Sequence, residues 1–141
     1  MNCRIIGREA FTAIKKENPK LDMSIVQYEH ELVDLEMNID AQDGLNFPLL
    51  MNLQYDEFNL HIGSFWGQWF SCKSPEVVQV FVDAVNGILS GQHRLKIINR
   101  NGKEVKALLQ AYDNGTWQCI YTWSKFNWPI GKKTHYYIQN N

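Results

Sequence analysis

The sequence predicts an α+β fold in which antiparallel sheets are accompanied by an N-terminal helix and by a central capped helix packed on a C-terminal β-meander. Three patterns predict it. Apolar residues recur at helical spacing over about 75–90, apolar and polar residues alternate over 33–40, and Asn-Gly pairs follow at 101–102 and 114–115. These patterns are typical of an amphipathic helix, a half-buried strand and tight hairpin turns. A chain of 141 residues that is 45% hydrophobic is expected to fold as one domain, residues 1–141.

The first half of the chain predicts one helix and about three strands. The helix covers 8–18 and ends before Pro19, because the residue preceding a proline avoids the α region. The strands are predicted over 25–40, 47–55 and 58–63. In the first of them the parity of the apolar residues changes at Leu32–Val33, which indicates either a β-bulge or two separate elements. A helix over 25–39 is the weaker interpretation, because the alternation over 33–40 is strict.

The central helix has the most complete set of end signals. Ser74 is the expected N-cap, Pro75 the first helical residue and Gly91 the residue that ends the helix. Its apolar stripe consists of Val78, Phe81, Val82, Val85, Ile88 and Leu89. Further strands are predicted over 93–100, 103–113, 116–124 and, after a turn at 128–131, over 134–138. Asn-Gly supplies the positive φ angles that the type I′ turns of such hairpins require.

Charge is distributed unevenly along the chain. Residues 21–72 contain nine carboxylates and no Lys or Arg, whereas the flanking segments are positively charged and the total is −1. On the predicted strand, Asp34, Glu36 and Asp40 share one face with Asn38, because side chains two apart point the same way. This row is interpreted either as a solvated edge strand that resists aggregation or as a patch that attracts a basic partner. A third interpretation is neutralisation by basic residues of neighbouring strands. These are Arg94, Lys96, Lys103 and Lys106.

The aromatic residues are the second unusual feature, with five Trp in the chain. Trp66 and Trp69 lie in the aromatic segment 65–70. In the C-terminal meander, the register set by the Asn-Gly turns predicts two different faces. The face that packs on the central helix carries Val105, Ala107, Leu109, Ala111 and Ile120. The other face carries Trp117, Cys119, Tyr121 and Trp123. Trp and Tyr are enriched at binding hot spots; the alternative is that these rings form a second core layer.

The sequence contains no motif of a catalytic, cofactor or metal site. There is no GxGxxG, P-loop, HExxH, GxSxG or EF-hand loop, so no cofactor, no bound metal and no enzyme activity are expected. His30 lies between two Glu, but on a strand it points away from both. Basic and aromatic residues over 94–125 have the ingredients of a nucleic-acid stacking platform. Nucleic acid is nevertheless not expected, because the nine carboxylates in the same small domain would repel phosphates.

Cysteine usage and the N-terminus predict a cytoplasmic protein. Cys3, Cys72 and Cys119 are odd in number and widely spaced, so each is expected to be a small apolar core residue rather than part of a disulfide or a zinc site. The N-terminus lacks the apolar segment of a secretory signal, and no apolar run is long enough to span a membrane. No membrane partner is therefore expected.

Together these features predict a non-catalytic protein-binding module. An acidic strand face would attract a basic protein partner and a Trp-rich patch would anchor it, a physical design that immunity and antitoxin proteins also use. The predicted partner-binding residues are Asp34, Glu36, Asp40, Trp66, Trp69, Trp117 and Trp123. Two alternatives are a small-molecule or carbohydrate-binding domain with Trp stacking surfaces, and a self-associating structural homo-oligomer whose oppositely charged faces meet.

Overall fold

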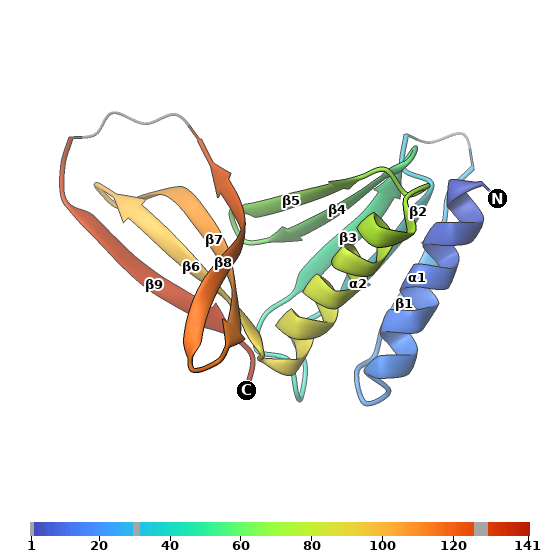
Figure 1. Ribbon diagram of the computed structural model, residues 1–141, viewed down its shortest axis with the longest axis horizontal. Coiled ribbons are helices and arrows are strands. Elements are labelled where there is room, and N and C mark those ends of the chain that lie inside the picture. Colours follow the sequence, from blue (N-terminus) through green and yellow to red (C-terminus); the bar gives the residue numbers. More distant parts are fainter. Residues whose placement is uncertain (1, 30–31, 126–129) are drawn as a thin grey trace.

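The computed structural model describes residues 2–29, 32–125 and 130–141, which form two helices and two antiparallel sheets (Figure 1). In chain order the elements are α1 (Cys3–Glu17), β1 (Ser24–Gln27), β2 (Leu35–Ile39), β3 (Leu49–Gln54), β4 (Glu57–Ile62), β5 (Phe65–Phe70), α2 (Pro75–Ser90), β6 (His93–Arg100), β7 (Lys103–Asp113), β8 (Thr116–Ser124) and β9 (Lys133–Gln139). Sheet 1 has the strand order β1-β2-β3-β4-β5, and sheet 2 has the order β8-β7-β6-β9. The predicted α+β class with antiparallel sheets is confirmed.

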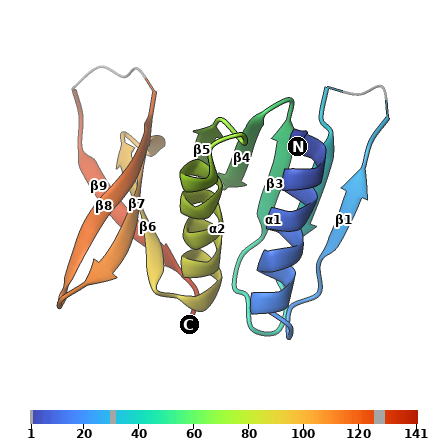
Figure 2. The same ribbon diagram turned by 45° about the vertical axis from the view of Figure 1, so that its right-hand side comes forward.

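The two helices lie side by side against one face of sheet 1, and no described helix covers the other face (Figure 2). The ends of α2 are as predicted. The Ser74 hydroxyl accepts a hydrogen bond from the Val77 amide, Pro75 is the first helical residue, and Gly91 is left-handed with a φ of 82°. Helix α1 begins earlier than predicted, because the side chain of Asn2 caps it by accepting a hydrogen bond from the Ile5 amide.

The C-terminal hairpins agree with the prediction. Strands β6, β7 and β8 have the predicted bounds, and both residues of each Asn-Gly pair have positive φ. Strand β9 pairs with β6 rather than with β8, so sheet 2 is a meander only over β6, β7 and β8. The predicted turn at 128–131 lies partly outside the described residues. His30 also lies outside them.

The first half of the chain contains more strands than predicted. Segment 25–40 forms two elements, β1 and β2, which pair with each other, so the change of parity marked separate strands rather than a bulge. Strands β3 and β4 lie where strands were predicted. Strand β5 was missed, because its sequence FWGQWF has apolar rings on both faces and no alternation of polar and apolar residues.

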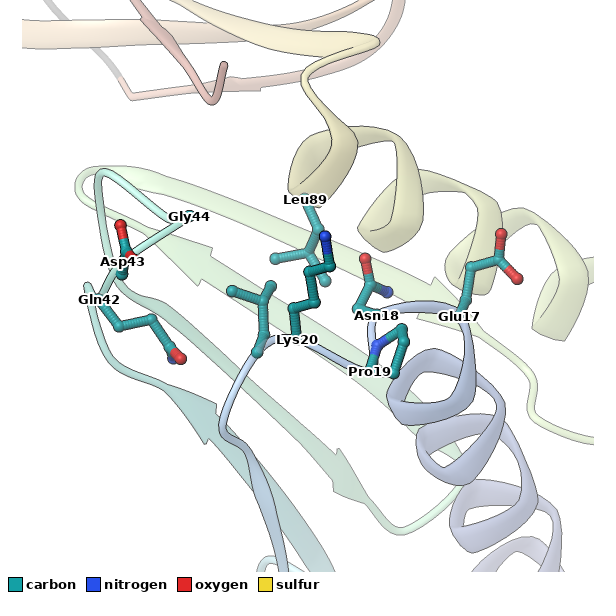
Figure 3. A pocket seen from close by; sticks show the side chains of 9 residues that line it. Glu17, Asn18, Pro19, Lys20, Gln42, Asp43, Gly44 and Leu89 are labelled. Carbon is teal, nitrogen blue, oxygen red and sulfur yellow. The ribbon is translucent and has the colours of Figure 1, made fainter.

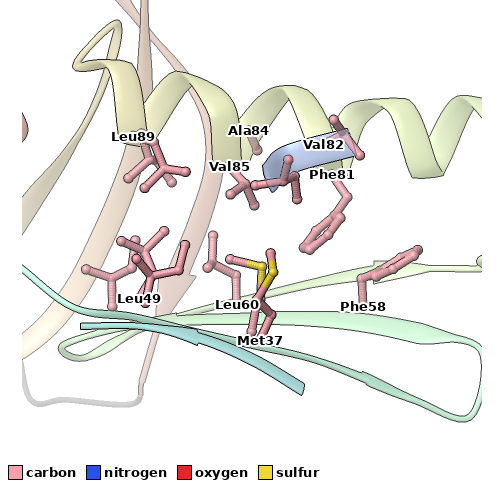
Figure 4. Packing of buried hydrophobic residues seen from close by; sticks show 14 of the residues in the cluster. Met37, Leu49, Phe58, Leu60, Phe81, Val82, Ala84, Val85 and Leu89 are labelled. Carbon is pink, nitrogen blue, oxygen red and sulfur yellow. The ribbon is translucent and has the colours of Figure 1, made fainter. Parts of the chain in front are cut away.

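Helix α2 packs on both sheets. Figure 4 shows its side chains Phe81 and Leu89 above the apolar residues of sheet 1. The rings of Phe58 and Phe81 stack with centroids 4.4 Å apart. The predicted contact with the C-terminal meander is also present, at Gly87, where an added Cβ would overlap the His93 ring. The central helix therefore sits between the two sheets rather than on the meander alone.

The two sheets meet where Tyr121 of β8 contacts β5. The Tyr121 hydroxyl accepts a hydrogen bond from the backbone N–H of Gln68 at 2.8 Å and donates one to the Gln68 carbonyl at 3.2 Å. Its ring contacts Phe65 and Trp69. Strand β5 is the last strand of sheet 1, so Tyr121 satisfies backbone groups that have no neighbouring strand.

The position of Tyr121 corrects the predicted faces of β8. A register shift leaves Ile120 unpaired and exposed instead of packed under the central helix. Because this bulge reverses the parity of the strand, Tyr121 and Trp123 turn toward the core, whereas Trp117 and Cys119 keep the outward direction. The prediction that all four residues share one face is therefore wrong.

Cys3 and Cys72 form a disulfide, which contradicts the prediction of unpaired core cysteines. Their Cα atoms lie 5.8 Å apart, although 69 positions separate them in the sequence. Spacing alone did not reveal the pair, because the contact depends on how the start of α1 lies beside the segment between β5 and α2. Cys119 is free and exposed, so it is not a core residue either.

Asn140 ties the C-terminal segment to the end of α2. Its side-chain amide donates hydrogen bonds to the Leu89 carbonyl at 2.6 Å and to the Gly44 carbonyl at 2.7 Å. Its side-chain oxygen accepts one from the Asn46 amide at 3.1 Å. The residue is buried, so these bonds replace water at the last turn of the helix and at the β2–β3 connection.

Replacing Cys3 with Ser is expected to lower the free energy of unfolding by about 4 kcal/mol, because the bond closes a long loop and restricts the unfolded chain. Urea unfolding followed by circular dichroism measures the change, and a reductant added to the wild-type protein should reproduce it. Cys119→Ser is the control and should leave stability unchanged, since this thiol is free and exposed. A wild-type midpoint that does not respond to reductant contradicts the prediction.

Candidate functional site

The face of sheet 1 that carries no described helix is the candidate site, and we call it the open face. Its centre consists of two cross-strand rows, because directly paired residues point to the same side. One row contains Glu36, Asn52, Asn59 and Gln68, and the other contains Asn38, Leu50, His61 and Trp66. All five strands lie within residues 21–72, so sheet 1 contributes no Lys or Arg to this face.

A chain of side-chain hydrogen bonds fixes the centre of the open face. Trp66 Nε1 donates to Asn59 Oδ1 at 3.1 Å, and Asn59 Nδ2 donates to Asn52 Oδ1 at 3.1 Å. Asn59 is 3% exposed, so its amide is bonded on both sides where water has little access. The His61 ring stacks on Trp66 with centroids 5.3 Å apart. Trp66 is thereby held in one orientation while 44% of its surface stays exposed.

An acidic hollow of about 280 Å³ lies at the β1–β2 end of the open face. It is lined by Asp22, Met23, Ser24, Val26, Glu36, Asn38 and Asp40. The Glu36 carboxylate accepts hydrogen bonds from the Tyr28 hydroxyl at 3.0 Å and from the Asn38 amide. Among the described residues, no Lys or Arg forms a salt bridge with Asp22, Glu36 or Asp40. Within the described ranges these carboxylates therefore share one hollow without a salt-bridged cation.

Asp34 does not line this hollow, which corrects the predicted acidic row. Strand β2 begins only at Leu35, and the Asp34 carboxylate turns to Arg4 of α1, with 3.0 Å between Oδ1 and Nη2. Its other oxygen accepts a hydrogen bond from the Tyr55 amide at 3.1 Å. Asp34 thus connects α1 to the β3–β4 turn. Within the described chain, the cation that pairs with a carboxylate of the predicted acidic row is Arg4 of α1. It does not come from the neighbouring strands that the sequence suggested.

The four predicted Trp residues do not form one surface. Trp66 lies on the open face. Trp69 is 8% exposed and contacts other rings of the core, as the alternative of a second core layer predicts. Trp123 packs against the core as well, whereas Trp117 points outward from sheet 2. Of the predicted partner-binding residues, the fold brings three to the open face and its rim: Glu36, Asp40 and Trp66.

Sequence reasoning missed the stacking of His61 on Trp66 and the hydrogen bond from Trp66 to Asn59, because both contacts depend on β5, the strand that was not predicted. Gly63, with a φ of 56°, and Ser64 form the turn before this strand, and such a Gly-Ser pair is the signal that identifies it. Partial burial lowers the pKa of His61 below its usual 6.5. The imidazole is therefore neutral at pH 7, and the open face keeps its lack of positive charge.

A larger hollow of about 640 Å³ lies away from the open face (Figure 3). It is formed by the end of α1 with its following loop, by the β2–β3 connection and by Leu89 of α2. The charged residues of its lining, Glu17, Lys20 and Asp43, are of both signs. The described lining contains no His, Cys or Ser, so it lacks the residues of a Ser–His or Cys–His pair.

Two further observations limit the chemistry of the described residues. No three of their His, Cys, Asp and Glu side chains are grouped closely enough to hold a metal ion. None of their helices combines the length and the apolar character needed to cross a bilayer. No family model, curated protein or solved structure matches this chain.

Asp34→Ala is expected to lower the free energy of unfolding by about 1–2 kcal/mol, because it removes a charged hydrogen bond to Arg4 and one to the Tyr55 amide. Asp40→Ala is the matched control, since Asp40 is exposed and forms no salt bridge among the described residues. Its effect should stay within about 0.5 kcal/mol. Urea unfolding of both variants checks this, and equal losses would show that Asp34 has no special structural role.

Stability is expected to fall as the pH drops below 6.5, in part through His61. In the unfolded chain His61 takes up a proton near its usual pKa of 6.5, whereas the folded chain resists protonation to a lower pH. The stability that neutral His61 contributes is therefore present above pH 6.5, and it is lost as the pH falls through the lower pKa of His61 in the folded state. NMR titration of the His61 imidazole measures that pKa, and His61→Gln should weaken the pH dependence of urea unfolding. An imidazole pKa above 6.5 would contradict the assignment.

Proposed function

We propose that the protein is a non-catalytic module that binds a basic protein partner on the open face of sheet 1. One observation carries the proposal. A five-stranded sheet exposes a face to which its own strands contribute no Lys or Arg, with a hollow of three carboxylates at its β1–β2 edge and an exposed, immobilised Trp on β5 at the other edge. Such a surface combines the charge that attracts a partner with the apolar area that holds it.

The electrostatic part of the proposal rests on Asp22, Glu36 and Asp40. Their charges lie in one hollow and have no salt bridge among the described residues, so they remain available to a cationic side chain. A field of one sign accelerates encounter with an oppositely charged surface and disfavours acidic competitors. The effect is screened over about 8 Å at physiological salt, so it acts mainly at close approach.

The anchoring part rests on Trp66 and its neighbours. Leu50 is 48% exposed and Trp66 44% exposed, and they flank His61 in one cross-strand row. Because Trp66 is already fixed by Asn59 and His61, burying it costs little rotamer entropy. Trp residues at the centre of an interface commonly carry most of its binding energy. An inhibitor of the immunity or antitoxin type, which covers a basic enzyme, uses this combination.

A cytoplasmic location stays a prediction. The bonded Cys3–Cys72 pair counts against it, because disulfides are rare in reducing compartments. Self-association also stays a prediction, and light scattering at high protein concentration tests it.

A carbohydrate ligand is the second candidate, and Trp66 favours it. Its exposed ring lies beside the side-chain amides of Asn59 and Asn52, and an aromatic platform with neighbouring amides suits stacking and hydrogen bonding of a sugar. The two candidates respond differently to the loss of charge. A sugar would tolerate Glu36→Gln, whereas a basic protein would not.

The triple variant Asp22→Ser/Glu36→Ser/Asp40→Ser is expected to lose capture of the partner, which affinity purification from the native host followed by mass spectrometry identifies. The matched control, Glu9→Ser/Glu17→Ser/Asp83→Ser, removes the same charge from the helices and should retain capture. Calorimetry with the purified partner should show at least about a tenfold loss for the first variant only. An acidic partner, or equal binding by both variants, refutes the proposal.

Trp66→Ala is expected to weaken binding of the same partner by about 30-fold, which corresponds to about 2 kcal/mol for an interface anchor. Trp117→Ala is the control, since Trp117 lies on sheet 2. Calorimetry measures both, and circular dichroism verifies that each variant is folded. Equal losses in the two variants would place the anchor elsewhere.

A further inference from the structure

Sheet 2 also has an outward face, the side of Trp117 and Cys119, which we call the basic face. Every Lys and Arg of the four strands lies on it, as the cross-strand pairs with outward residues establish. These residues are Arg94, Lys96, Arg100, Lys103, Lys106 and Lys133. The four strands contain two carboxylates, Glu104 and Asp113. Both lie on the other side of sheet 2, Glu104 because the register shift at Ile98–Asn99 pairs it with Asn99. The strands thus give this face positive charge and no negative charge.

Aromatic rings are interleaved with these cations. The guanidinium carbon of Arg94 lies 4.1 Å from the ring centroid of Trp117 and 4.0 Å from that of Tyr137. Its Nε donates a hydrogen bond to Gln110 Oε1 at 2.8 Å, so the guanidinium is fixed between the rings. The rings of Tyr112 and Trp117 meet edge to face, with their centroids 5.2 Å apart. Tyr112 and Tyr137 are 56% and 43% exposed, so their rings remain accessible.

A hollow of about 470 Å³ lies next to Arg94 on the same face. It is lined by Gly91, Gln92, Tyr112, Trp117 and Gln139. Gln139 is directly paired with Arg94, which places the fixed guanidinium at the edge of the hollow. Aromatic walls and amide groups beside a cation suit a planar, hydrogen-bonding group that is attached to an anion.

From these observations we infer that the basic face binds a single-stranded nucleic acid. Its phosphates would lie along Lys96 and Lys106, and an unstacked base would enter the hollow beside Tyr112 and Trp117. Stacking on protein rings requires bases that are free of a duplex, which selects the single-stranded form. An acidic peptide would use the cations alone and would leave the rings and the hollow without a function.

The structure removes the sequence argument against nucleic acid. The nine carboxylates that would repel phosphates lie in residues 21–72, and this segment supplies the strands of sheet 1 and their connections, not sheet 2. They therefore lie on a different sheet from the basic face, and salt screens their field beyond a Debye length of about 8 Å under physiological conditions. This site is independent of the proposed partner site on the open face.

Fluorescence anisotropy with fluorescein-labelled oligouridine and oligodeoxythymidine of about 12 nucleotides tests the inference. Wild-type protein should bind at least one of them at low salt. Trp117→Ala should weaken binding at least about fivefold, as expected when one stacked base has no ring beneath it. Lys96→Ala/Lys106→Ala should reduce the slope of log affinity against log salt by about 0.7 for each phosphate that the variant no longer neutralises. This double variant keeps the test valid if Trp117→Ala does not fold.

Two controls distinguish the alternatives. Lys15→Ala/Lys16→Ala removes two exposed cations from α1 and should leave oligonucleotide binding unchanged. The triple variant of the acidic hollow should also leave it unchanged, so failure of one site does not decide the other. The inference is overturned if neither oligonucleotide binds, if the α1 control weakens binding equally, or if labelled oligoglutamate binds more tightly than both oligonucleotides and is unaffected by Trp117→Ala.

Discussion

Helix α2 is the constraint on which the arrangement of this molecule depends, because its apolar stripe has to serve two sheets. Phe81 stacks on Phe58 of sheet 1 and also contacts Trp69, which in turn meets Tyr121 of sheet 2. Each sheet buries one face against this common centre. The opposite faces have no further described element to cover them, so the molecule presents two broad β surfaces.

The order of the chain decides the charge of these two surfaces. Sheet 1 is drawn from a segment without Lys or Arg, and sheet 2 is drawn from the segment after α2, whose basic residues all point outward within the strands. A net charge of −1 therefore conceals an opposite sign of charge in the strands of the two sheets. Net charge alone says little about the partners of such a protein, because a partner meets one face at a time.

Local signals were sufficient wherever neighbours in the sequence decide the structure. The ends of α2 and the Asn-Gly hairpins depend on single residues with strong conformational preferences, and they were predicted correctly. Charge and composition also singled out Glu36, Asp40 and Trp66, which lie on the open face and its rim, and their role in binding stays a prediction. The failures have non-local causes. One unpaired residue, Ile120, reverses a strand face, and the roles of Asp34 and Cys3 depend on partners that only the fold brings near. No pattern of apolar and polar residues contains that information.

The docking of Asn140 has a consequence for how the protein forms. The carbonyl of Leu89 needs an amide that lies 51 positions later in the chain, and the same side chain also holds the β2–β3 connection. A nascent polypeptide that has just left the ribosome exit tunnel with α2 complete still lacks this amide. The Leu89 carbonyl is therefore left to water during synthesis, and it gains its buried partner only when the last strand has joined the edge of sheet 2.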